Sequence, residues 1–263
     1  MKRVLIFAAY CKNGKIREDV TDLLRAFRPF ADKILFVADS EADEDEQLKL
    51  KDIADYVRCR RHGEYDFGSY KHGWKTVLSA QWLNDADELV FCNDSCYAPV
   101  FPLAEMFCKM DAADCDFWGV VESPEIRPYL QSWFWAFRRQ AFSSEAFEAF
   151  MNGITGCSSP RELIAKYEVP MTAFFKERGF KAASYIDWDS PLPPTACPVS
   201  LLKKRCPFVK RKVFQRTKYS AESVLETLKI VKNANPKLHR QIKASCGLKL
   251  AGLLINRGMR SLF

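Results

Sequence analysis

Two short apolar segments near the start of the chain, separated by an amphipathic one, constrain its fold more than any other feature. Residues Arg3–Ala9 and Lys33–Ala38 are rich in apolar side chains, as expected of strands covered on both faces. Residues 19–30 between them place Leu23 and Phe27 at helical spacing. A strand, a helix and a second strand form the repeating unit of parallel sheets. The sequence therefore predicts an α/β fold with a mostly parallel central sheet flanked by helices.

The rest of the chain continues this alternation. Apolar segments predict further strands at residues 53–58, 88–92, 117–121, 133–137 and 181–186, and helical spacing predicts helices at 70–82, 103–110, 144–151 and 171–178. The acidic segment 40–47 is predicted to be a surface loop. Four prolines between residues 191 and 198 indicate a linker or an extended arm. The 263 residues are predicted to form one large domain, 1–190, and a basic helical extension, 191–263.

The extension carries most of the positive charge. Residues 203–263 hold sixteen Lys and Arg residues and two acidic ones, whereas residues 1–202 hold 24 basic and 31 acidic residues. This asymmetry predicts a polyanionic partner, either an anionic membrane surface or a nucleic acid, with solvated helix faces as the plainer alternative. Residues 247–263 mix leucines with lysine and arginine, a pattern typical of segments that lie in the membrane interface.

Apolar runs and cysteine usage bear on the compartment. The sequence has no run of eighteen apolar residues, so it predicts no membrane-spanning helix. Its ten cysteines show no Cys-x-x-Cys pair and no zinc-type spacing with histidine. A chain that can bury a core of this size has little need of disulfides, so reduced cysteines are expected. We therefore expect a cytoplasmic protein, held peripherally on the inner face of the cell membrane.

Three polar residues, Asn93, Asp94 and Ser95, follow a buried strand directly. Open α/β sheets bind ligands at the carboxyl ends of their strands. A carboxylate in this place can hold Mg²⁺ or Mn²⁺, and the cation can neutralise a leaving diphosphate. The plainer alternative is that Asp94 only caps a turn through its side chain.

Two further segments suggest weaker sites. Asp66, Gly68 and Lys71 lie where a glycine-containing loop enters a helix, and helix N-termini attract phosphate; alternatively, Asp66 is an N-cap and Lys71 is solvated. Glu168 precedes a helix predicted to begin at Pro170. A carboxylate there can act as a general base, although glutamate is also favoured at helix N-termini for its charge alone.

Taken in order, these segments resemble the rhamnan synthesis protein F family of bacterial glycosyltransferases. The resemblance is carried by YDFGSYK at 65–71, ELVFCNDSCY at 88–97, PVFPL at 99–103, MD at 110–111, DFWG at 116–119, LQSWF at 130–134, SEAF at 144–147, YE at 167–168 and GF at 179–180. It covers residues 65–180 well and the opening strands more loosely. As an ordered set it is specific, although each piece alone is not.

The resemblance implies a GT-A-like nucleotide-diphospho-sugar transferase fold and assigns roles to individual residues. The residues that would bind the donor are Ala8, Tyr10, Asp39, Asp66, Gly68, Lys71, Asn93, Asp94 and Ser95. Asp94 would be the metal ligand, although Asn93 stands where the family pattern has the first Asp of Asp-x-Asp. Glu168 would be the base of an inverting transfer. The residues that could position acceptor sugars, or pack in the core instead, are Tyr97, Trp118, Gln131, Ser132 and Trp133.

The implied reaction is transfer of a sugar from a nucleotide-diphosphate donor, with dTDP-rhamnose as the leading candidate. The expected acceptor is a polyprenyl-diphosphate-linked glycan or a polysaccharide in cell-surface polysaccharide synthesis. Two other functions remain open at this point. A catalytically silent module of the same fold would bind glycans or scaffold an assembly. A nucleic-acid-binding protein would use the basic extension, but the sequence shows no helix-turn-helix, zinc or RNA-recognition motif.

Overall fold

The predicted strand–helix–strand unit forms at the start of the chain. The computed structural model describes residues 1–125, 127–215 and 218–255, with side chains as far as residue 246. β1 (Arg3–Ala9) pairs in parallel with β2 (Lys33–Ala38), and α1 (Glu18–Phe27) connects them. Both strands have their predicted bounds. The helix changes to a 3-10 turn at Arg28–Phe30, which contains a proline.

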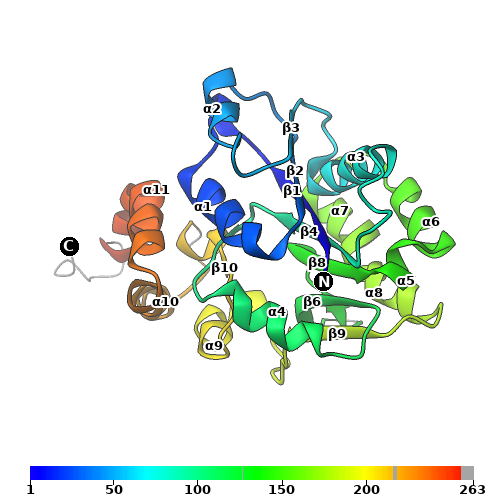
Figure 1. The fold of residues 1–263 in the computed structure, drawn as a ribbon. Helices are drawn as coiled ribbons and strands as arrows, with labels where there is room; N and C mark the ends of the chain where they lie inside the picture. The colour runs from blue at the N-terminus through cyan, green and yellow to red at the C-terminus, as the bar shows by residue number, and fades with distance from the viewer. Residues whose placement is uncertain (126, 216–217, 256–263) are drawn as a thin grey trace.

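One mixed sheet runs through the molecule (Figure 1). Its strand order is β3 (Tyr56–Cys59), β2, β1, β4 (Glu88–Asn93), β8 (Phe134–Arg138), β6 (Phe117–Ser123) and β7 (Tyr129–Leu130), with β9 (Ala182–Ile186) paired to β6. Strands β3, β2, β1 and β4 are parallel, and β8 runs antiparallel to both β4 and β6. The predicted α/β class, with a mostly parallel sheet flanked by helices, is confirmed.

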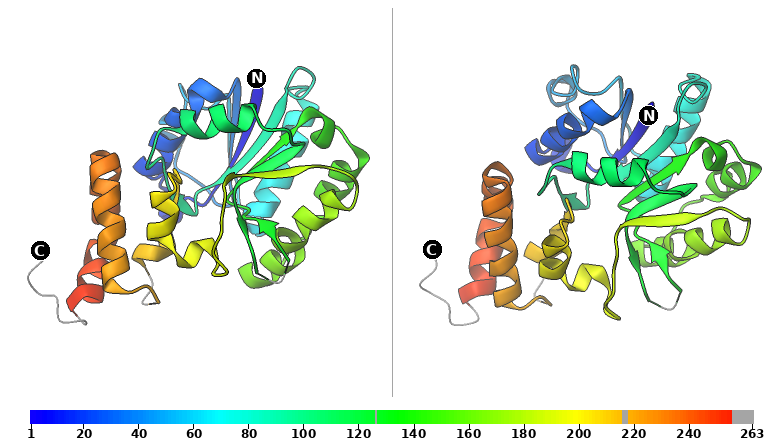
Figure 2. Two further views of the ribbon diagram at one scale, coloured as in Figure 1. Left: turned by 90° about the horizontal axis from the view of Figure 1, so that it is seen from below. Right: turned by 60° about the horizontal axis from the view of Figure 1, so that its bottom comes forward.

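Helices cover both faces of the sheet (Figures 1 and 2). On one face, α1 and α4 (Leu103–Asp111) pack on side chains from the central strands. On the other face lie α3 (Tyr65–Ser79), α6 (Glu145–Gly153) and α8 (Val169–Lys176). A short helix, α5 (Arg139–Phe142), precedes α6. The two apolar layers hold the sheet rigidly, and its strand ends are therefore fixed relative to one another.

Two segments differ from their predictions. The expected loop at 40–47 contains a short helix, α2 (Glu44–Leu48), whose acidic first turn is favoured by the helix dipole. No new helix begins at Pro170. Instead, α7 (Pro160–Leu163) continues through a π-helical turn, Ile164–Glu168, directly into α8. The wider turn is compatible with Pro170, which has no N–H to donate.

The basic extension packs against the first domain. Here α9 (Pro198–Lys203), α10 (Ala221–Ala234) and α11 (Pro236–Ile255) surround a third apolar cluster (Figure 2). Helix α11 packs on α10 and lies beside α1. Lys237 and Gln241 of α11 both contact Asp22 of α1, at 2.6 and 2.7 Å. The strand β10 (Val209–Lys210) pairs with β5 (Cys96–Tyr97). The division at residue 190 remains a prediction, but contacts cross it in several places.

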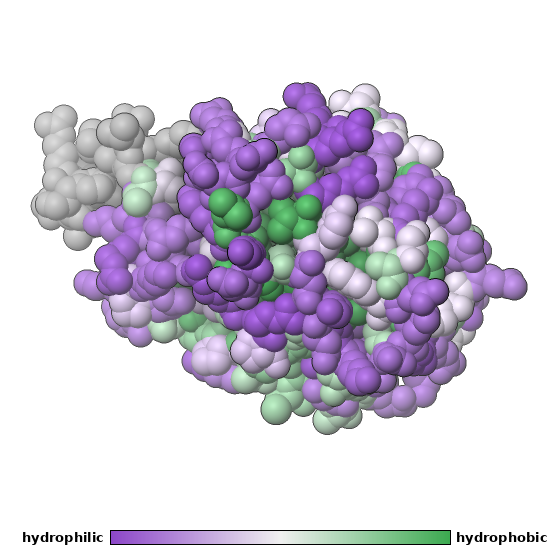
Figure 3. All heavy atoms as spheres, turned by 45° about the horizontal axis from the view of Figure 1, so that its top comes forward, coloured by the Kyte–Doolittle hydropathy of each residue, from purple (hydrophilic) through white to green (hydrophobic). Residues whose placement is uncertain are grey.

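The membrane predictions concern the last part of the extension. Side chains of residues 247–263 lie outside the described residues, so the amphipathic segment remains a prediction. None of the helices described for this chain has the length and apolarity needed to span a bilayer. Most of the surface visible in Figure 3 is hydrophilic; one group of hydrophobic residues lies in a hollow near its centre, and others lie at the right and along the lower edge.

Candidate functional site

A cavity of about 540 Å³ opens at the carboxyl ends of β1, β2 and β4. This is the edge at which parallel sheets of this kind bind ligands, and the volume is in the range of small-molecule sites. The lining residues are Ala8, Ala9, Tyr10, Asp39, Arg61, Gly63, Tyr65, Asp66, Asn93, Asp94, Ser95, Pro160 and Leu163. Seven of the residues predicted to bind the donor thus line this one cavity: Ala8, Tyr10, Asp39, Asp66, Asn93, Asp94 and Ser95.

Gly68 and Lys71, the other two residues predicted to bind the donor, do not line this cavity. The Lys71 ammonium donates to the carbonyl oxygens of Asn152 and Ile154. Gly68 lies under Glu64, where an added Cβ would be 2.3 Å from the Glu64 Cβ. Both predictions are corrected on this evidence: Lys71 ties α3 to the end of α6, and Gly68 makes room for a neighbouring side chain.

The Asp39 carboxylate holds the loop of residues 62–65, which forms one wall of the cavity. Its Oδ1 accepts hydrogen bonds from the backbone N–H groups of His62 and Gly63, both at 2.7 Å, and its Oδ2 accepts one from Tyr65 at 3.0 Å. Gly63 and Tyr65 both have positive φ, at 75° and 58°. For Tyr65 this conformation costs energy, and the Asp39 carboxylate stabilises it.

A chain of polar contacts crosses the floor of the cavity. Asn93 Nδ2 donates to Asp66 Oδ2 at 2.7 Å, and Ser95 Oγ donates to Asn93 Oδ1 at 2.6 Å. Lys210 Nζ then donates to Ser95 Oγ at 2.8 Å. Burial and the nearby Glu168 carboxylate raise the pKa of Asp66 to about 6, with the Lys210 charge acting in the opposite direction. Asp66 is therefore a carboxylate that exchanges its proton close to neutral pH.

Asp94 is surrounded by positive charge from protein side chains. Its Oδ2 accepts from Arg17 Nη2 at 2.8 Å and from the Tyr10 N–H at 3.2 Å. Its carbonyl oxygen accepts from Arg211 Nε at 2.7 Å. The neighbouring Asn93 Oδ1 is already bonded to Ser95. A single carboxylate paired with arginine does not fit Mg²⁺ or Mn²⁺, which prefer several free oxygen ligands.

The sequence analysis missed the cations near this site: Arg61, which lines the cavity, and three others that contact Asp94 or Ser95 without lining it. Arg17 comes from the segment before α1, while Lys210 and Arg211 come from the extension, whose basic residues were interpreted as a membrane contact. The pairing of β10 with β5 brings them to Ser95 and Asp94. Each strand has two residues, and no local sequence pattern indicates such a pair.

Glu168, the predicted base, lies behind the cavity wall. It is buried, with 7% exposure, and its Oε2 accepts from Ser132 Oγ at 2.6 Å. The Ser132 carbonyl in turn accepts from the Tyr70 hydroxyl at 3.0 Å. Glu168 does not line the cavity. Its charge still acts on the site, because it contributes to the raised pKa of Asp66.

The residues predicted to contact an acceptor are all buried, and none lines the cavity. Trp118 is a core residue whose Nε1–H donates to Glu88 at 2.7 Å, and Glu88 also pairs with Arg3. The Tyr97 hydroxyl lies 2.8 Å from Ser245 Oγ of α11. The alternative of core packing therefore describes Trp118 and Tyr97, because a fully buried ring has no face left for a sugar. Ser132 donates to Glu168, the Trp133 carbonyl accepts from the Asn93 N–H of β4, and Gln131 Nε2 donates to the Tyr129 hydroxyl at 3.3 Å.

Comparison with known proteins gives one extended match. A family model described as Rhamnan synthesis protein F matches residues 34–239. A curated relative, virulence protein VirA of Vibrio anguillarum, strain ATCC 68554 / 775, is 24% identical over 126 residues. The matched segment is 47% of this chain and 40% of that protein, so this chain spans less than half of the relative.

Solved structures show weaker likenesses. A cytidylyltransferase from Leptospira borgpetersenii has 15% identity and a TM-score of 0.42, over 90% of this chain and 95% of that one. Glucosyl-3-phosphoglycerate synthase from Mycobacterium tuberculosis, in complex with Mn²⁺, uridine diphosphate and phosphoglyceric acid, has 10% identity and a TM-score of 0.39, over 68% and 78%. At such TM-scores these likenesses support no conclusion about function.

Proposed function

The chain belongs to the rhamnan synthesis protein F family, and on this basis we propose that it is a glycosyltransferase with a GT-A-like fold whose cavity binds a nucleotide-sugar donor. The observation that supports this most directly is the cavity floor. A carboxylate with a pKa near neutrality, Asp66, lies in hydrogen-bonding connection with a cation, Lys210. A proton acceptor and a stabiliser of negative charge are the two groups that glycosyl transfer from a diphosphate requires.

The cations would act on the leaving group. As the bond between the anomeric carbon and the diphosphate breaks, negative charge develops on the diphosphate oxygens. Arg61 lines the cavity itself, and Lys210 contacts Ser95 at the Asn93–Ser95 corner. Arg17 and Arg211 lie at the same corner, paired with the Asp94 and Asp19 carboxylates. Positive charge held in place before reaction stabilises the transition state without reorganisation. This arrangement supplies what a metal supplies in related reactions, and it agrees with the poor fit of Mg²⁺ or Mn²⁺ at Asp94.

Asp66 is the better candidate for the base. It lines the cavity, whereas the originally expected Glu168 is buried behind it. In the proposed inverting step, the acceptor hydroxyl attacks the anomeric carbon, the bond to the diphosphate breaks, and the hydroxyl proton passes to Asp66. A base whose pKa lies near the working pH is effective in such a step. Glu168 becomes a positioning residue, held by a hydrogen bond from Ser132. Together with burial, the negative charge of Glu168 raises the pKa of Asp66.

The substrates follow from the family. We propose dTDP-rhamnose as the donor and a polyprenyl-diphosphate-linked glycan as the acceptor, in synthesis of a cell-surface polysaccharide. The extension would hold the enzyme on the cytoplasmic face of the membrane, where such an acceptor is presented. Its lysines and arginines would each contribute about 1 kcal/mol near an anionic leaflet.

Titration calorimetry with dTDP-rhamnose, UDP-glucose and GDP-mannose, each with and without Mn²⁺, tests the donor site. We expect one donor to bind at micromolar concentration without Mn²⁺, and the Asp66→Asn variant to bind it but lack transfer. Binding of none of the three would contradict the proposed donor class. Binding without transfer or hydrolysis by the wild type, given a lipid-linked acceptor, would favour the silent module.

A further inference from the structure

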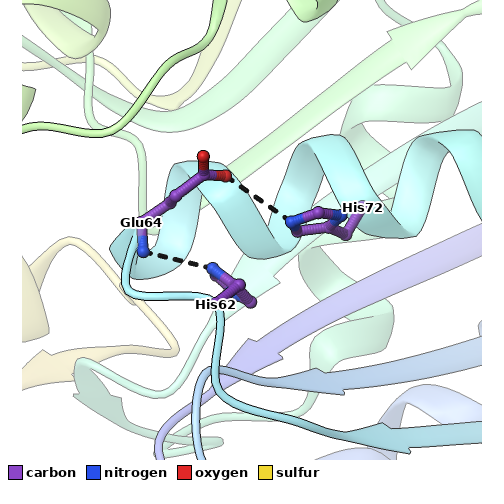
Figure 4. Close-up of side chains that lie close together, drawn as sticks. All are labelled: His62, Glu64 and His72. Carbon is purple, nitrogen blue, oxygen red and sulfur yellow. Dashed lines mark hydrogen bonds and ion pairs between the residues drawn. The ribbon is translucent and has the colours of Figure 1, made fainter.

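A second cluster of chemically active side chains lies outside the cavity. His62 and Glu64 come just before α3, and His72 lies within that helix, about two turns from its start (Figure 4). One ligand atom from each of the three lies within 4.8 Å of the others. The two imidazole rings are 4.8 Å apart, and Glu64 Oε2 is 3.5 Å from His72 Nε2. None of these side chains lines the cavity, and glycosyl transfer as proposed does not use them.

The three residues have the chemistry of a metal site. Two imidazoles and one carboxylate, with a fourth position open, are a known ligand set of Zn²⁺. Imidazole suits Zn²⁺, Cu²⁺, Fe²⁺ and Ni²⁺, whereas Mg²⁺ and Mn²⁺ are better held by oxygen ligands.

The surroundings support the cluster from two sides. On one side, the Glu64 N–H donates to His62 Nδ1 at 3.2 Å and holds the ring, which leaves Nε2, now 3.0 Å from Ser69 Oγ, as the nitrogen that would bind a metal. On the other side, Gly68 leaves the necessary space. A Cβ at this position would lie 2.9 Å from both Glu64 Oε2 and His62 Cε1. Glycine at residue 68 thus has a steric explanation in this cluster.

We propose that His62, Glu64 and His72 form a site for one divalent transition-metal ion, with Zn²⁺ as the first candidate. Tetrahedral coordination with bonds of about 2.0–2.1 Å requires ligand atoms about 3.3 Å apart. The three ligand atoms therefore need to approach one another by up to about 1.5 Å. Glu64 and His72 have 29% and 30% exposure, which leaves them free to turn, whereas the His62 side chain has 9% exposure and is held in place.

A bound ion would tie the loop before α3 to the body of the helix. The residues beside the cluster, Gly63 and Tyr65, line the cavity and hold unusual backbone conformations. Metal binding would therefore stiffen one wall of the cavity from behind. This role is independent of the proposed transfer chemistry, because the ion lies outside the cavity.

The test is a Zn²⁺ titration of the full, untagged chain by calorimetry. We expect one ion to bind per chain, and His72→Gln to weaken binding by at least about tenfold, as loss of even an outer partner does in known sites. His239 is the only other histidine in the chain, so His239→Gln is a matched control that should bind as the wild type does. Glu64→Gln keeps the side-chain shape and should also weaken binding.

The ten cysteines are the main competing ligands, and Co²⁺ distinguishes them. Bound Co²⁺ should give the visible bands of a tetrahedral site with nitrogen and oxygen ligands, without a thiolate charge-transfer band. A thiolate band at one equivalent would overturn the proposal, as would undiminished Zn²⁺ affinity in His72→Gln. Lack of stoichiometric binding by the wild type would also overturn it. None of these outcomes depends on whether the chain transfers sugars.

Discussion

At the scale of single residues, Asp66 stands out because its surroundings raise the pKa of its carboxyl group. Its pKa of about 6 in the folded protein lies above the usual value near 3.9. Between these values the folded state binds more protons than the unfolded state. The free energy of unfolding therefore falls as pH rises from about 4 to about 6 and stays lower above that range. The site retains a carboxylate that reduces stability at neutral pH.

Because ionised Asp66 lowers the free energy of unfolding, the Asp66→Asn variant has a predictable stability. At pH 7.5 the variant should melt at a higher temperature than the wild type, because it removes a poorly solvated charge. At pH 4 the two should melt at nearly the same temperature, since Asp66 is then protonated. Thermal unfolding at both pH values measures this. A variant that is less stable than the wild type at pH 7.5 would contradict the raised pKa.

Lys210 gives a second prediction at this scale. If it contacts the diphosphate, Lys210→Ala should weaken donor binding by about 10- to 100-fold, since a hydrogen bond to a charged group contributes about 1.5–3 kcal/mol. Lys232→Ala, on the exposed face of α10, is the matched control and should leave donor affinity unchanged. Equal effects of the two substitutions would show that general charge, rather than Lys210 itself, attracts the donor.

The same residues show what the sequence could predict about the site. Asn93 was predicted from the end of its strand, whereas Ala8 and Asp39 were implied by the family resemblance; all three line the cavity, because parallel strands end at a common edge. Lys210 was missed because it reaches that edge through a two-residue strand far along the chain. For Trp118 the sequence left a sugar contact and core packing both open, because burial of its ring depends on β8, α4 and Glu88 together, none of which a local motif reveals.

At the scale of secondary structure, close packing of α3 on β1 depends on a glycine. A Cβ on Gly73 would lie 2.4 Å from Ile6 Cγ2, so the helix rests almost directly on the strand. This contact fixes the height of α3 over the sheet and hence the position of Asp66 in its first turn. The sequence predicted the helix from its apolar spacing, but it did not predict that the helix and the strand lie this close.

Gly73→Ala should therefore destabilise the fold by about 1–3 kcal/mol, the usual cost of overpacking a core. Gly153→Ala is the control, because a Cβ there meets no atom within 4 Å. It should be neutral or slightly stabilising, since alanine favours a helix over glycine. Urea unfolding of both variants measures the difference. A Gly73→Ala variant as stable as the wild type would mean that α3 shifts without cost.

Helix boundaries illustrate where local signals were insufficient. Pro170 was interpreted as the start of a helix, which is its usual place. In the structure it lies within a continuous helix, because the π-helical turn Ile164–Glu168 precedes it. That turn also places Glu168 toward Ser132. Strand β1, in contrast, was predicted to the residue, because an apolar segment buried on both faces leaves little choice.

At the scale of the whole molecule, an acidic body carries a basic extension. The charge separation predicts binding to vesicles that contain anionic lipid, and weak binding to neutral ones. Binding should fall steeply between low salt and 0.5 M salt, because screening shortens the range of the attraction. Vesicle sedimentation measures this, and a chain that ends at residue 246 should bind less tightly. Equal binding to neutral vesicles would contradict the proposed surface association.

The pairing of β5 with β10 also has a consequence for biosynthesis. A ribosome releases the chain from its N-terminus onward, so the sheet and most of the cavity can form while the last quarter is still being made. Lys210 and Arg211 emerge late, and only then do Ser95 and Asp94, which line the cavity, gain these two cationic neighbours. A nascent or prematurely terminated chain would therefore present a folded but inactive pocket. Translation itself would delay activity until the part that is proposed to meet the membrane is nearly complete.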